Sequence, residues 1–246
     1  MQESFLLFYI LLFIVAFLYA SVGHGGASGY LALMAIFAIS PAVMKPTALL
    51  LNLFVSSTSF IQFYRGGHFK WKMFWPFAAA SIPLSFMGGT MAIESAAYKK
   101  ILGVLLLIPV IRFFFFEDTD PKDFNKASIP LSLVIGGTIG LLSGMIGIGG
   151  GIILSPVILL LKWADQKKTA AISAAFIFVN SLAGLAGQLI KGLYFNADML
   201  TFVSIAFLGG ICGAYFGALK FPQAVLKNVL ACVLALAAYK LLFTQA

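Results

Sequence analysis

Long apolar runs separated by short polar stretches are the main pattern along this chain. A helix needs about 20 mostly apolar residues to cross a hydrocarbon core of about 30 Å. Eight runs reach that length, roughly at residues 5–39, 45–64, 71–93, 97–116, 129–161, 167–190, 198–219 and 223–243. The pattern predicts an all-α, polytopic membrane protein. The first run is too long for a signal peptide, so we expect it to remain as a membrane segment.

Two runs, 5–39 and 129–161, are longer than the others and are interrupted by glycines. A straight helix of about 33 to 35 residues would measure about 50 Å, far more than one crossing needs. The chain must therefore turn or tilt at these glycines. Each half of the sequence then consists of one glycine-broken segment followed by three ordinary membrane helices.

The second half of the chain also repeats the first half in the same order. The matched phrases are SVGHGGASG from Ser21 and MIGIGGGII from Met145, KPTA from Lys45 and KKTA from Lys167, QFYRGGHF from Gln62 and QLIKGLYF from Gln188, and YKKILGVLLLIPVIRFFF from Tyr98 and LKNVLACVLALAAYKLLF from Leu226. Such duplication is common in transporter folds. We predict a first repeat at residues 1–116, a polar linker at 117–128 and a second repeat at 129–246, together forming one membrane domain.

The path of the broken segments decides how the two halves are related. If each segment folds back as a hairpin, the halves are inverted; if each runs straight through, they are parallel. The hairpin arrangement places eleven Lys and Arg residues on one face and five on the other, whereas the straight arrangement places eight on each. Cytoplasmic loops carry an excess of basic residues. The count therefore favours inverted repeats with both termini outside, and parallel repeats remain the alternative.

Composition narrows the choice of partners. The chain is 61% hydrophobic and only 10% charged, against about 25% charged residues in a soluble domain. The net charge of +8 comes from Lys and Arg residues scattered at segment ends, which fits lipid headgroups and an anionic solute and does not fit nucleic acid. Cys212 and Cys232 lie in apolar segments without metal-ligand spacing, so we expect small buried side chains.

Acidic residues are absent from the predicted membrane interior. All eight Asp and Glu residues lie at the N-terminus, in the linker or at segment ends. Cation carriers and many proton-driven carriers keep a buried carboxylate, so a small neutral or anionic solute is the better expectation. The sequence shows no catalytic constellation, metal-ligand cluster or cofactor motif, and we expect no enzyme activity, no metal and no cofactor.

The glycine breaks supply an attraction for an anion. Where a membrane helix restarts, its free N–H groups and the positive end of its dipole form an anion site. Glycines there permit positive backbone dihedrals and close approach of a solute. The candidate residues are Gly23, Gly25, Gly26, Gly147, Gly149, Gly150 and Gly151, with the hydroxyl of Ser28 added in one copy. The alternative is that these glycines form a close helix-packing surface.

Three further side chains are candidates for the site. His24 lies within the first break and could accept a proton near neutral pH, or could be an ordinary hydrogen-bonded loop histidine. Asn52 and Asn180 are bulky amides well inside their segments. They could line a site, or could hydrogen-bond a neighbouring helix, which is the commoner use of such residues.

The glycine phrases SVGHGGASG and GLLSGMIGIGGGIILSP, the stretches KPTALLLN and KKTAAISAAF, and QFYRGGHFKWK resemble the TauE/SafE family of sulfite exporters and organosulfonate permeases. The likeness extends over almost the whole chain. It implies a duplicated carrier for sulfur-containing anions such as sulfite, sulfonates and sulfoacetate. The first half departs from the fuller glycine run of the second, because Ala27 stands opposite Gly151 and His24 opposite Ile148.

These observations predict a multi-pass cell-membrane transporter that works by alternating access at a site shared by the two breaks. An anion channel and a non-transporting membrane accessory subunit remain the alternatives. A membrane enzyme would need a reactive cluster that the sequence does not offer. The direction of transport and the coupling ion are left open by the sequence, and the protein could be a monomer or a homo-oligomer.

Overall fold

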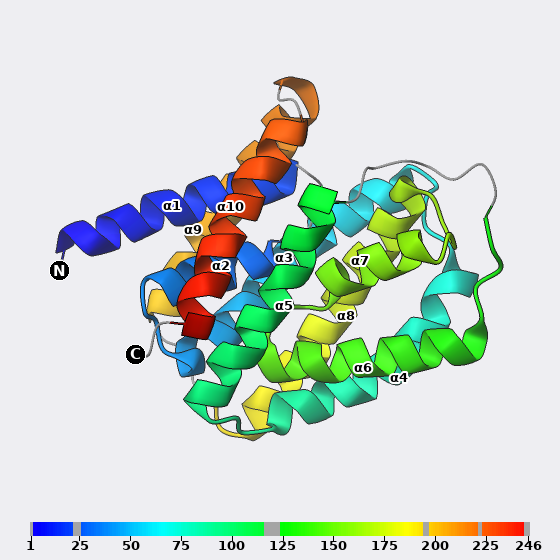
Figure 1. Ribbon diagram of the computed structural model, residues 1–246, viewed down its shortest axis with the longest axis horizontal. Helices are drawn as coiled ribbons and strands as arrows, with labels where there is room; N and C mark the ends of the chain where they lie inside the picture. The colour runs from blue at the N-terminus through cyan, green and yellow to red at the C-terminus, as the bar shows by residue number, and fades with distance from the viewer. Residues whose placement is uncertain (1, 22–25, 116–123, 194–196, 221–222, 244–246) are drawn as a thin grey trace.

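The computed structural model describes residues 2–21, 26–115, 124–193, 197–220 and 223–243, and these contain helices and no strand. The predicted all-α, polytopic class is confirmed. The helices are α1 Gln2–Ser21, α2 Ala27–Ile36, α3 Pro41–Arg65, α4 Trp71–Thr90, α5 Ser95–Phe115, α6 Ile129–Ile146, α7 Gly151–Leu160, α8 Gln166–Ile190, α9 Ala197–Lys220 and α10 Gln223–Phe243 (Figure 1).

The first glycine-broken run forms α1 and the short helix α2. The rings of Phe8, near the start of α1, and Phe37, just after α2, meet edge to face with centroids 5.2 Å apart. The chain therefore returns along α2 toward the end of the molecule from which α1 started. Gly23, His24 and Gly25 lie outside the described residues.

The second glycine-broken run forms α6 and the short helix α7, and it also folds back. Asn125, before α6, donates its backbone N–H to the carbonyl oxygen of Lys162 at 2.8 Å, and its side-chain amide to that of Leu161 at 3.0 Å. Both of those acceptors follow α7. The run therefore leaves the bundle at the end where it entered.

The most extensive helix contacts join segments that are far apart in the sequence. Helix α4 packs on α6, and α1 packs on α9. Gly140 and Gly144 of α6 lie against Ser81 and Ser85 of α4, so this pair is parallel. The α1–α9 pair is also parallel, since Phe8 contacts Phe202 and Phe13 contacts Gly209. By contrast, α5 and α10 are antiparallel, with Gly103 against Leu242. The division into repeats at 1–116 and 129–246 stays a prediction.

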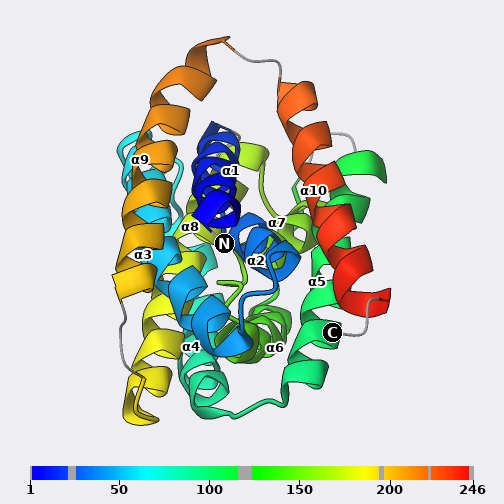
Figure 2. The same ribbon diagram turned by 90° about the vertical axis from the view of Figure 1, so that its left-hand side faces the viewer.

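The short helices α2 and α7 lie inside the bundle. In the view of Figure 2, α3, α8 and α9 lie on one side of them and α5 and α10 on the other. One continuous apolar core contains residues from both short helices, such as Leu31 of α2 and Leu154 of α7, each fully buried. The helix N-termini created by the breaks therefore begin within the interior and not at the surface.

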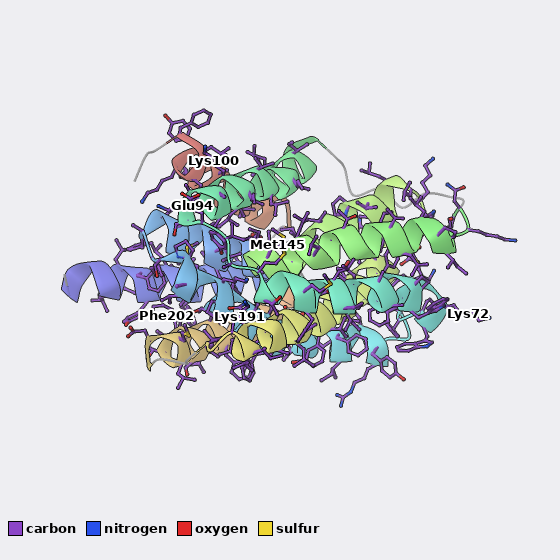
Figure 3. The ribbon with its side chains drawn as sticks, turned by 90° about the horizontal axis from the view of Figure 1, so that it is seen from below. Lys72, Glu94, Lys100, Met145, Lys191 and Phe202 are labelled. Atoms are coloured by element: carbon purple, nitrogen blue, oxygen red, sulfur yellow. The ribbon has the colours of Figure 1, made fainter. Side chains whose placement is uncertain are left out.

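The outer surface suits a bilayer. By length and composition, α3, α6 and α8 are the described helices that qualify as membrane spans. Large apolar side chains such as Val134, Leu200 and Leu236 are exposed on the helices, as expected for groups that face lipid. Lys72 lies toward the opposite end of the molecule from Glu94 and Lys100 (Figure 3).

The expectation of buried cysteines was wrong. Cys232 is exposed on α10 and Cys212 is partly exposed on α9. Both helices lie at the periphery of the bundle (Figure 2), so apolar character in these segments reflects contact with lipid as much as burial within the protein.

Candidate functional site

The break between α6 and α7 is built from left-handed glycines. Gly147, Gly149 and Gly150 have φ angles of 90°, 76° and 78°, a region that costs other L-residues roughly 1–2 kcal/mol. Two glycines depart from the expected dihedrals. Gly26 has φ of −73° and Gly151 is the first residue of α7, so neither uses the left-handed region.

The N-terminus of α7 has backbone donors that its own helix does not use. The first helical acceptor is the carbonyl of Gly150, which accepts from Ile153 at 3.1 Å and Leu154 at 3.0 Å. The N–H groups of Gly151 and Ile152 precede these bonds, and both residues are buried. Within the described chain, no side chain caps this end of α7. The positive end of the helix dipole therefore points into the interior.

Asn52 lies beside this break. A methyl group on Gly149 would stand 2.5 Å from the Asn52 amide nitrogen, so only glycine leaves room for the amide. Asn52 is fully buried, and among the described residues neither its amide nitrogen nor its oxygen has a hydrogen-bond partner. Leaving such a group unpaired costs about 1–3 kcal/mol. An amide with free donors next to an uncapped helix N-terminus is suited to hold a polar ligand.

The other glycines of the break are held by packing. A side chain at Gly150 would meet Phe176, and one at Gly151 would meet Ile177. Close packing therefore accounts for glycine at these two positions, and their part in binding stays a prediction. Gly147 packs its backbone against that of Lys45, so the loop runs along α3 from Lys45 to Asn52.

Hydroxyl groups lie around the start of α2. Ser28, in the first turn of α2, shares a hydrogen bond of 2.7 Å with the hydroxyl of Tyr19. Tyr30 is also fully buried, and within the described residues its hydroxyl has no partner. Its ring tip lies against Gly26, where a methyl group would stand 2.5 Å from the hydroxyl oxygen. The sequence did not single out Tyr30, because a tyrosine within an apolar run is expected to belong to the packed core.

Asn180 has a different environment from Asn52. Its amide nitrogen donates to the carbonyl of Phe176 at 2.8 Å, and its own backbone carbonyl accepts from the Ser85 hydroxyl at 2.8 Å. Its amide oxygen is buried and unpartnered among the described residues. Asn180 thus belongs to the contact between α4 and α8, whereas Asn52 faces the glycine break.

Lys45 is a second residue that sequence reasoning did not place at the site. It lies in the first turns of α3, and its ammonium group donates to the carbonyl oxygens of Gly88 and Gly89 at 3.3 and 3.4 Å. These carbonyls are at the C-terminal end of α4, where a cation is favourable. Because the Lys45 backbone touches Gly147, this contact also fixes the position of the break relative to α4.

The carboxylates whose burial the structure describes lie at helix ends. Glu94 and Asp198 are exposed, and Asp165 is half-buried at the start of α8. Burial would raise the pKa of Asp165, but hydrogen bonds from Lys168 and its positive charge outweigh that effect and hold the pKa below its usual value. Within the described ranges, no three His, Cys, Asp or Glu side chains lie together as a metal site would require.

Comparison with known proteins places this architecture among transporters. The chain matches the profile of the family described as "Sulfite exporter TauE/SafE" over residues 8–241. It is 34% identical over 240 residues to a probable membrane transporter protein of Sinorhizobium fredii, covering 95% of this chain and 96% of that protein.

Two more distant relatives have the same kind of name. A probable membrane transporter protein of Methanocaldococcus jannaschii is 29% identical over 137 residues, covering 53% of this chain and 51% of that protein. Another, from Bacillus subtilis, is 24% identical over 198 residues, covering 72% of each. No solved structure matches the chain.

Proposed function

The chain belongs to the TauE/SafE sulfite exporter family of membrane transporters, and from that premise we propose that it is a secondary transporter for a small sulfur-containing anion. The cargo is of the sulfite, sulfonate or sulfoacetate class. It binds between the two helix breaks, and the site opens to each side of the membrane in turn.

The unpartnered amide of Asn52 beside the N-terminus of α7 carries this proposal. An anion placed there would accept from the Asn52 amide and from the free N–H groups of α7, and would gain from the helix dipole. Asn52 would no longer be unpaired. The carboxylates whose burial is described, Glu94, Asp165 and Asp198, are exposed or half-buried at helix ends, so their repulsion of the cargo is small.

The directions of the helices support inverted halves. A twofold axis in the membrane plane would exchange the parallel α4–α6 pair with the parallel α9–α1 pair. The same axis would exchange α5 with α10, and a twofold axis in the membrane plane requires such a pair to be antiparallel, as it is. Both broken segments fold back to the end at which they start. Inverted repeats of this kind are the usual basis of alternating access, because exchanging the conformations of the two halves reverses the open side.

Replacing Asn52 by leucine tests the proposal. The change removes both polar atoms and keeps the side-chain size, so Asn52→Leu should fold as stably as the parent or more so. Sulfite uptake into proteoliposomes should fall by about tenfold or more, because a hydrogen bond to a charged group is worth roughly 1.5–3 kcal/mol. Saturable uptake with counterflow would identify a carrier, and single-channel currents would instead identify a pore.

Thr169→Val provides a matched control. The Thr169 hydroxyl is also buried and without a partner in the described chain, but it lies near the start of α8 beside the Asp165 cap. Uptake by this variant should equal that of the parent. Unchanged KM and maximal rate in Asn52→Leu would contradict the proposed site.

A further inference from the structure

The two helix breaks differ in the polar groups around them. An amide, Asn52, lies beside the N-terminus of α7, whereas three hydroxyl groups, those of Tyr19, Ser28 and Tyr30, lie around the start of α2. By the alignment of the repeats, Tyr30 corresponds to Leu154, a buried apolar residue. The two halves therefore cannot hold a ligand with the same set of donors.

The Tyr30 hydroxyl is buried at the N-terminus of its own helix. Side chains on a helix lean toward its N-terminus, and the Tyr30 ring accordingly reaches back one turn to Gly26, the N-cap of α2. The side chain is 0% exposed, and in the described part of the protein its hydroxyl meets neither donor nor acceptor. The nearby Ser28 hydroxyl is already engaged with Tyr19 at 2.7 Å.

The backbone beside this hydroxyl is the N-terminal turn of α2. The first bond of α2 runs from the N–H of Tyr30 to the carbonyl of Gly26 at 3.0 Å. The N–H groups of Ala27, Ser28 and Gly29 come before it, and all three residues are buried. No described side chain caps this end of the helix. Every helix has such an end, but here a buried hydroxyl without a partner lies against it.

Packing alone does not account for the hydroxyl of Tyr30. A phenylalanine would fill the same space and would avoid the penalty of a buried, unpaired O–H group. The Tyr19 hydroxyl differs, because its bond to Ser28 stabilises the contact between α1 and α2. The unpaired Tyr30 hydroxyl destabilises the empty protein, and a bound ligand that accepts its hydrogen bond would remove this cost.

We propose that the Tyr30 hydroxyl donates a hydrogen bond to an oxygen atom of the transported anion. The inference rests on the proposed function and adds to it a hydrogen-bond donor at the N-terminus of α2. An oxoanion of sulfur has several oxygen acceptors, and one of them would accept from Tyr30 where its ring meets Gly26.

Tyr30→Phe tests this assignment, because the variant lacks only the hydroxyl. The thermal melting temperature of the empty protein should stay the same or rise. Sulfite and ethanesulfonate affinities, measured by calorimetry on purified protein, should fall by about tenfold or more. Tyr239→Phe removes an exposed hydroxyl from α10 and should leave every value unchanged.

The outcomes separate this inference from the proposed function. If Tyr30→Phe binds sulfite as tightly as the parent while Asn52→Leu does not, the role of Tyr30 is wrong and the transport site stands. If the parent protein binds neither sulfite nor ethanesulfonate, the proposed function fails and takes this inference with it.

Discussion

Two separate constraints determine which residue can stand at position 149, in the break between α6 and α7. The left-handed backbone at Gly149 demands glycine, and the amide of Asn52 occupies the space that a side chain there would need. The glycine break and the burial of Asn52 could be predicted from the sequence, because helix interruptions and amides within apolar segments are visible in the order of residues; their part in binding stays a prediction. The positions of Tyr30 and Lys45 could not be predicted, because their contacts are with neighbours that only the folded chain brings together.

Gly149→Ala violates both constraints. Positive φ at a non-glycine residue costs roughly 1–2 kcal/mol, and the new methyl group would also displace the Asn52 amide. We expect reduced thermal stability and a loss of sulfite transport by at least about tenfold.

Gly67→Ala is the control, since Gly67 has a similar φ of 73° and open space around it. This variant should lose stability by a comparable amount and retain transport. Equal transport by both variants would show that the space beside Asn52 is unimportant.

Whole helices are positioned by close backbone contacts. Gly136, Gly140 and Gly144 recur every fourth residue on α6 and lie against the backbone of Phe77, Ser81 and Ser85 on α4. Small residues are enriched where membrane helices approach closely. The sequence predicted where helices begin and end to within a few residues. It did not predict which helices pair, because α4–α6 and α1–α9 join segments from different halves.

Gly140→Leu should separate α4 from α6. The added side chain would meet the Ser81 backbone, which has no flexible end that could move aside, and overpacking of this kind costs about 1–3 kcal/mol or more. Thermal unfolding in detergent should therefore occur at a lower temperature. Thr138→Leu, at an exposed position of the same helix, should be tolerated. Equal melting temperatures for the two variants would contradict the close contact.

At the scale of the whole molecule, the fold brings the short helices α2 and α7 into the interior of one bundle (Figure 2), and Glu94 lies far from Lys72 along its length (Figure 3). The sequence predicted the broken segments. It favoured the hairpin path over the straight one only through the count of basic residues, because hydropathy does not encode direction. Contacts of Asn125 with Lys162 and of Phe8 with Phe37 supply that direction.

Locating a bound oxoanion directly tests the central claim that the helix breaks hold the cargo. Selenite is a pyramidal oxoanion like sulfite, and its selenium atom scatters X-rays anomalously. Crystals soaked in selenite should show an anomalous peak within hydrogen-bond distance of the Asn52 amide and the N–H groups that open α7. A selenium peak elsewhere, with no anomalous density at either break, would contradict the account.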